Sequence, residues 1–89
     1  MMTEREILEQ LIAAREYVRE NADALRQEYG SDYLAVSGNS VIDYDADKFQ
    51  LMNRTINQGR IITYGTIDHL AGHPEQLEAM KRLKELIAA

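Results

Sequence analysis

Three aspartates at alternate positions, Asp43, Asp45 and Asp47, have the spacing of a metal site. They match the first three ligand positions of an EF-hand calcium loop, which also needs glycine at its sixth position and a bidentate glutamate at its twelfth. Here those two positions hold Lys48 and Arg54. Because a cation replaces the strongest ligand, we expect no calcium site, and weak magnesium binding is the alternative. The aspartates are predicted to cap the following helix, with Asp45 or Asp43 as the N-cap.

Two histidines, His69 and His73, are four residues apart, the spacing that places two zinc ligands on one helical face. A glycine and a proline flank His73, so the helix is predicted to break between them. The nearby carboxylates are Asp68 and Glu75, and the spacing fixes no third ligand. We expect solvated loop histidines and no metal; a polar contact in an interface, or a structural or catalytic metal, are the alternatives.

Catalytic groups are not brought together by the sequence. Three serines lie in or beside predicted turns, far along the chain from either histidine: Ser31, Ser37 and Ser40. The five glycines are scattered singly, so no phosphate-binding loop is predicted. We therefore predict no enzyme, no catalytic residue and no cofactor.

Polar residues do gather after the third predicted strand, at an end of the sheet where α/β proteins often bind ligands. The group comprises Thr63, Tyr64, Thr66, Asp68 and His69. A cavity that holds Tyr64, Asp68 and His69 together would favour a small-molecule or metal-binding protein, with or without enzymatic activity. This is the alternative to a non-catalytic role.

Composition limits the remaining classes. The 89 residues make a single domain, 1–89, whose net charge of −5 provides no basic field for nucleic acid. Residues 48–66 nevertheless carry three basic residues and no acid. These positive charges either steer a partner or form ion pairs within the chain. The absence of cysteine excludes disulfides and thiolate chemistry. No segment has the length of a membrane span, and the first residues form no apolar leader, so we expect a cytoplasmic protein.

The N-terminal segment predicts a helix. Thr3-Glu4-Arg5-Glu6 is a capping box, and apolar residues then recur every three or four positions until Gly30. One helix of about 25 residues would be roughly 37 Å long, more than so small a domain covers alone. Two outcomes stay open: the chain breaks near Asn21, or the first turns pack on the C-terminal helix or on another copy of the protein.

The segment between Tyr33 and Tyr44 predicts a β-hairpin. Residues 33–36 and 41–44 are rich in β-branched and aromatic side chains, and Gly38-Asn39 between them can adopt the positive φ of a two-residue turn. The two runs do not alternate cleanly between apolar and polar residues. This indicates that helices cover both faces of the sheet.

A third helix is predicted from Ala46 to Gln58, ended by a glycine and with an apolar face formed by Phe49, Met52 and Ile56. Arg60 to Tyr64 then predicts a short third strand. A right-handed crossover sets this strand parallel to the second. It lies beside either the first or the second strand, and we favour the first.

The remaining residues predict a short helix and a final long one. Thr66 to Ala71 form one or two turns, and Pro74 begins a helix that runs to about Ala88. Its inward residues are predicted to be Leu77, Met80, Leu83 and Ile87. The whole is an α+β fold in the order helix, strand, strand, helix, strand, helix. A small three-stranded mixed sheet is packed by the long N-terminal and the C-terminal helix.

A family resemblance lies in Glu16-Tyr17-Val18 followed by Tyr29-Gly30-Ser31-Asp32-Tyr33-Leu34-Ala35-Val36. The pattern resembles short prokaryotic proteins grouped as domain of unknown function 5678. It consists of a helix ending in Tyr-Gly, an aromatic and an aliphatic residue, Ala-Val, a turn, a valine strand and a further helix. The resemblance covers residues 14–64, and the C-terminal helix looks like an addition. It implies a compact α+β domain without an established activity, and it brings no catalytic residues.

The function predicted from these patterns is a non-catalytic interaction module that binds a copy of itself, as a homodimer or larger homo-oligomer, or another protein. Excess helix length is the main reason. Tyrosine, which favours interfaces and the rims of small cores, occurs five times against one phenylalanine: Tyr17, Tyr29, Tyr33, Tyr44 and Tyr64. An antitoxin-like regulator of a neighbouring gene product is a further alternative that small size and acidity permit.

Overall fold

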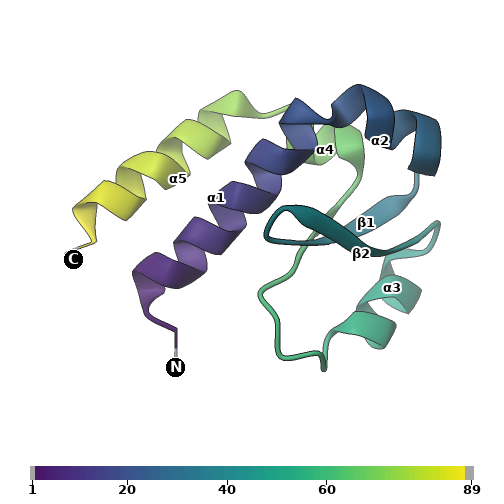
Figure 1. Ribbon diagram of the computed structural model, residues 1–89, viewed down its shortest axis with the longest axis horizontal. Helices are drawn as coiled ribbons and strands as arrows, with labels where there is room; N and C mark the ends of the chain where they lie inside the picture. Colours follow the sequence, from purple (N-terminus) through teal and green to yellow (C-terminus); the bar gives the residue numbers. More distant parts are fainter. Residues whose placement is uncertain (1, 88–89) are drawn as a thin grey trace.

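A small sheet with helices on both faces forms the centre of the protein, as Figure 1 shows for the computed structural model, which describes residues 2–87. The helices are α1 (Glu4–Glu20), α2 (Ala22–Tyr29), α3 (Lys48–Thr55), α4 (Ile67–Ala71) and α5 (Pro74–Leu86). The strands are β1 (Tyr33–Ser37), β2 (Ser40–Asp45) and β3 (Thr63–Gly65). The predicted α+β class and order of elements are confirmed. None of the helices in the described residues is long and apolar enough to cross a membrane.

The sheet has the order β2-β1-β3, and both pairs are antiparallel. The third strand therefore runs in the direction of the second and lies beside the first, as predicted. The sheet is nevertheless not mixed: because β1 separates β2 from β3, the two strands of equal direction are not neighbours. The third strand also begins at Thr63, three residues later than predicted.

The hairpin closes through the two-residue turn expected from the sequence, since Ser37 pairs with Ser40. Gly38 has a φ of 58°, whereas Asn39 has no positive φ. Positive φ at the first turn position alone is typical of a type II′ turn. A register shift between Ala35 and Val36 leaves Ile42 without an opposite residue in β1. This bulge is one reason why the strand sequences do not alternate.

The N-terminal helix begins at the predicted capping box. The amide of Glu6 donates to Thr3 Oγ1, and the amide of Thr3 donates to Glu6 Oε1, both at 3.1 Å. The chain breaks at Asn21, one of the two outcomes left open. Its side chain caps the end of α1, since Asn21 Nδ2 donates to the carbonyl of Tyr17 at 2.9 Å, and it does not cap the start of α2.

The main core lies between the sheet and the layer formed by α1, α2 and α4. Its buried members come from these helices and from β1: Ala14, Val18, Leu25, Leu34, Val36, Ile67 and Leu70. A second, smaller core joins the outer parts of α1 and α5 through Leu8, Ile12 and Leu77, with Met80 and Ile87 packed against it. Figure 1 shows α5 beside α1, with the start of α1 and the end of α5 on the side away from the sheet.

Helix α3 covers the opposite face of the sheet and buries Leu51 and Thr55. The predicted apolar face is wrong as a core face, because Phe49 is 76% exposed and Ile56 is 62% exposed. The last helix shows a smaller difference of the same kind. Leu77 is buried as predicted, but Leu83 is 51% exposed. The predicted end at Ala88 lies outside the described residues.

Candidate functional site

The three aspartates are held by the protein's own groups. The guanidinium of Arg54 donates from Nε and Nη2 to the two carboxylate oxygens of Asp43, each at 3.1 Å, and from Nη1 to Asp45 Oδ2 at 2.6 Å. Asp47 turns toward α3, where its Oδ1 accepts from two backbone amides at 2.9 and 3.3 Å. The N-cap is therefore Asp47 and neither of the two residues predicted, because α3 begins two residues later than expected.

This arrangement stabilises the charged forms of the aspartates. Hydrogen bonding to Arg54 lowers the pKa of Asp43. The backbone amide of Asp47, followed by Arg54, lowers the pKa of Asp45. The two carboxylates in turn raise the pKa of the Arg54 guanidinium. The residue that replaces the twelfth-position calcium ligand thus serves as the partner of the acids that a calcium ion would otherwise bind.

The same cluster closes the outer edge of β2. The backbone amide of Tyr44 donates to Asp43 Oδ1 at 2.7 Å, and the carbonyl of Tyr44 accepts from Arg54 Nη2 at 3.1 Å. Since β2 pairs with β1 on one side only, these groups face the free edge. An edge strand with open backbone groups is a template for pairing with another chain. The aspartates and Arg54 therefore block strand addition at this position.

We expect the variant Arg54→Met to be less sensitive to acid than the wild type. A carboxyl whose pKa is lower in the folded state stabilises the fold above its unfolded pKa, about 3.9. That stabilisation is lost as the pH falls through the folded-state value. Urea unfolding at neutral pH and at about pH 2 should show that acid lowers the free energy of unfolding more in the wild type than in Arg54→Met. Arg60→Met, which removes an exposed arginine outside this cluster, should keep the wild-type dependence; equal losses in all three proteins would contradict the assignment.

The histidines lie edge to face, with ring centroids 5.3 Å apart. His73 Nδ1 is 3.2 Å from Glu75 Oε1, while Asp68 turns away and accepts from Arg26 Nη2 at 2.7 Å. The pKa of Glu75 is lowered, first by the hydrogen bond that its carboxylate accepts from the Glu75 backbone amide and then by the hydrogen bond with His73. Within residues 2–87 no three His, Cys, Asp or Glu side chains are placed to hold one metal ion.

The polar group after β3 is divided between several roles. Tyr64 Oη and Thr55 Oγ1 are 2.6 Å apart, which fixes the ring of Tyr64 against α3. Thr66 caps α4 by accepting from the amide of His69 at 3.2 Å. Thr63 Oγ1 is buried without a hydrogen-bond partner. Of the residues predicted to act together, Tyr64, Thr66 and His69 line one cavity, whereas Thr63 and Asp68 are not among its walls.

Two surface cavities of about 330 Å³ each contain parts of that group. Tyr64 and His69 line one of them, together with Lys48 from the start of α3. Asp68 lines the other, beside Arg26. The sequence indicated three walls of the first cavity, Tyr64, Thr66 and His69, but missed Lys48. The lysine lies sixteen residues before the tyrosine and reaches it only through the crossover from β2 to β3.

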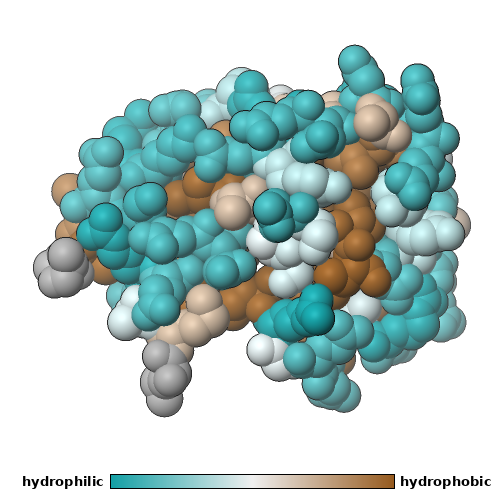
Figure 2. Space-filling view, viewed as in Figure 1, coloured by the Kyte–Doolittle hydropathy of each residue, from teal (hydrophilic) through white to brown (hydrophobic). Residues whose placement is uncertain are grey.

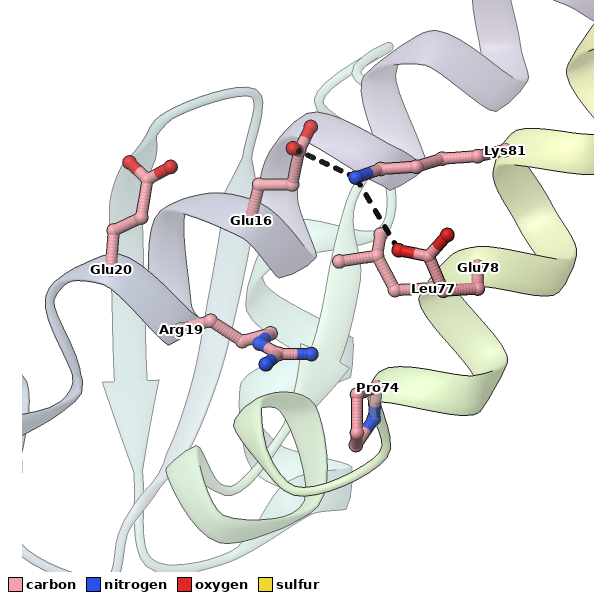
Figure 3. Close-up of a pocket in the computed structure, with 7 residues that line it drawn as sticks. All are labelled: Glu16, Arg19, Glu20, Pro74, Leu77, Glu78 and Lys81. Carbon is pink, nitrogen blue, oxygen red and sulfur yellow. Dashed lines mark ion pairs between the residues drawn. The ribbon is translucent and has the colours of Figure 1, made fainter.

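A third cavity, of about 280 Å³, lies between α1 and α5. Figure 3 shows Lys81 reaching from α5 toward Glu16 of α1 and Glu78 of its own helix. The distances from Nζ to the carboxylate oxygens are 3.4 and 3.8 Å. In the same view Arg19 points into the space between the helices and Glu20 points away. The ion pair between Lys81 and Glu16 joins the two helices across this seam.

We call the outer ends of these helices the arm: residues 4–12 of α1, residues 77–86 of α5 and Ile87, which follows α5. An apolar groove of about 200 Å³ runs along it. Its walls are Glu4, Ile7, Leu8, Leu11, Leu83 and Ile87. Leu86 lies in the same part of α5 and is 82% exposed. Figure 2 shows hydrophobic surface in the seam between α1 and α5, and a larger hydrophobic area over the part of the same face that holds the sheet.

Two of the serines and three of the tyrosines take structural positions. Ser40 Oγ donates to the carbonyl of Ser37 at 3.3 Å within the hairpin turn, and neither serine is bonded to a histidine. The rings of Tyr29 and Tyr44 pack at 4.8 Å between centroids, and Tyr17 and Tyr29 border the main core. Burial, followed by the neighbouring Glu28, raises the pKa of Tyr29.

The fold and these surfaces define an α+β domain with helices on both faces of an antiparallel sheet and an exposed apolar groove on a two-helix arm. Comparison of the chain with protein-family models, curated proteins and solved structures gave no match.

Proposed function

We propose that this chain is a non-catalytic interaction module that pairs with a second copy of itself through the arm. The observation that carries the proposal is the apolar groove between the start of α1 and the end of α5. The arm's own core contains only three buried residues. Two amphipathic helices packed side by side bury one stripe of apolar residues on each other. A second pair of helices placed over them produces the four-helix arrangement found in many bundles.

The charges on the arm favour a copy of the same chain as the partner. Acids outnumber bases three to one in residues 3–10, whereas bases outnumber acids three to one in residues 81–86. The groove shows that these two segments lie side by side. A two-fold axis presents the same surface from both copies. It can place the acidic end of α1 in one copy over the basic end of α5 in the other.

The variant Leu83→Lys tests this assignment. Leu83 is 51% exposed, so the change should leave the fold of each chain intact. It should raise the dissociation constant of the dimer by about tenfold or more, because it buries a charge in the apolar interface. Sedimentation equilibrium over micromolar to millimolar concentrations measures this constant, and circular dichroism verifies folding.

Ile56→Lys provides the matched control. Ile56 is an exposed aliphatic residue of similar size directly after α3, on the far side of the sheet from α1. Its substitution should leave the dissociation constant unchanged. A wild-type protein that stays monomeric throughout the concentration range would refute self-association. Dissociation by Ile56→Lys alone would assign the interface to the exposed face of α3 in place of the arm.

A further inference from the structure

The cavity beyond β3 has an unusual set of walls for so acidic a protein. It is lined by a lysine, a histidine, two tyrosines, a threonine and a glycine: Tyr33, Lys48, Tyr64, Gly65, Thr66 and His69. Every one of these side chains that is polar can donate a hydrogen bond, and none is a carboxylate. Four other surface cavities each include at least one carboxylate. In a chain of net charge −5, this cavity therefore has no carboxylate among its walls to repel an anion.

Lys48 brings a charge that is not neutralised locally. It forms no ion pair within residues 2–87. The preceding acid, Asp47, is engaged with the backbone amides at the start of α3. A lysine as first residue of a helix also opposes the helix dipole, which favours acids there. Helix stability thus does not explain this lysine, and local departures of this kind are expected at functional sites.

The topology brings the walls together from three separate segments. Tyr33 begins β1 opposite Asp45, the last residue of β2, and the neighbouring Leu34 lies opposite Gly65, the last residue of β3. The ends of β2 and β3 therefore meet at the same end of the sheet as the start of β1. Lys48 follows β2 and His69 follows β3, so both reach this end. Rigid strands thereby position groups that lie far apart in the sequence.

We propose that this cavity binds a small aromatic oxyanion, with its carboxylate or phosphate at Lys48 and His69 and its ring against the tyrosines. The bond between Tyr64 Oη and Thr55 Oγ1 holds one of these rings in place before a ligand arrives. A fixed aromatic wall reduces the entropy lost on binding. The lysine supplies a point charge and the imidazole a hydrogen bond in a fixed direction. This site is independent of the arm and of self-association.

A nuclear magnetic resonance titration of the whole chain with phenyl phosphate and with benzoate tests the proposal. Amide signals of Gly65, Thr66 and His69 should shift and saturate with at least one of the two, and this identifies which oxyanion the site prefers. Phenol, which has the ring without the oxyanion, should produce no saturating shift. Inorganic phosphate, which has no ring, should bind more weakly than phenyl phosphate.

The variant Lys48→Gln should weaken binding of the preferred probe by about tenfold or more, because a charged hydrogen bond is lost. Lys84→Gln removes the same charge from α5 and should bind like the wild type. Absence of saturation with both probes, equal shifts with phenol, or unchanged binding to Lys48→Gln would each overturn the oxyanion site. Equal binding of inorganic phosphate and phenyl phosphate would refute the role of the tyrosine rings.

Discussion

Replacing Leu51 with alanine should lower the free energy of unfolding by roughly 2–5 kcal/mol, the range for a fully buried leucine. Leu51 is fully buried on the side of α3 that faces the sheet. The other attachments of this helix are polar: the bond from Thr55 to Tyr64, and the contacts of Arg54 with β2. The cost within that range depends on how far the neighbouring side chains close the cavity.

Equilibrium unfolding in urea, followed by circular dichroism, measures the effect of Leu51→Ala. Phe49→Ala is the matched control on the same helix. It removes a larger side chain, but this side chain is 76% exposed. A surface substitution of this kind should change stability by no more than about 0.5 kcal/mol. The reverse order of effects would show that α3 packs through the face predicted from the sequence, and would contradict the observed rotation of the helix.

The orientation of α3 shows why periodicity alone failed here. Phe49, Met52 and Ile56 form the most apolar stripe, so the spacing favours burying it. The sheet surface beneath α3 is partly polar, however, because Asp43, Asp45 and Tyr64 face that side and are bonded to the helix. A helix that presents Arg54 and Thr55 to these partners turns Phe49 and Ile56 outward and leaves Met52 half-buried. Partners from other strands are not visible in the spacing of one segment.

Other elements were predictable because their signals are local. The capping box, the turn at Gly38-Asn39 and the proline at the start of α5 each act within a few residues, and all lie where the sequence places them. The break at Asn21 stayed open, because it depends on how much helix the rest of the domain covers. The sheet was predicted as mixed although the favoured strand order makes it antiparallel.

The cavity that we propose as a binding site was only half predictable. Tyr64 and His69 belong to one segment, and their place after a strand indicated a site at that end of the sheet. Lys48 joins them because β2 and β3 run in the same direction on either side of β1. Asp68 leaves the group because its helix directs it toward Arg26 in α2. Both outcomes depend on contacts between distant segments, so spacing along the chain predicts neither.

Two threonines with buried hydroxyl groups should respond in opposite directions to the same chemical change. Thr63→Val replaces a buried hydroxyl that has no partner with a methyl group of similar size. It should raise the free energy of unfolding by about 1 kcal/mol, since an unpaired polar atom is removed and valine suits a strand. Thr55→Val removes a hydroxyl that is 2.6 Å from Tyr64 Oη and donates to the carbonyl of Leu51 at 2.8 Å. It should cost about 1–3 kcal/mol, because the partner tyrosine is left unsatisfied.

The comparison separates hydrogen bonding from packing, because both substitutions preserve a β-branched shape and nearly the same volume. Urea unfolding of the two variants and of the double variant measures the effects, which should add because the residues use different partners. Tyr64→Phe should reproduce most of the loss seen in Thr55→Val. A destabilising Thr63→Val would show that a buried water molecule satisfies its hydroxyl. A neutral Thr55→Val would show that the short bond to Tyr64 contributes little to holding α3 on the sheet.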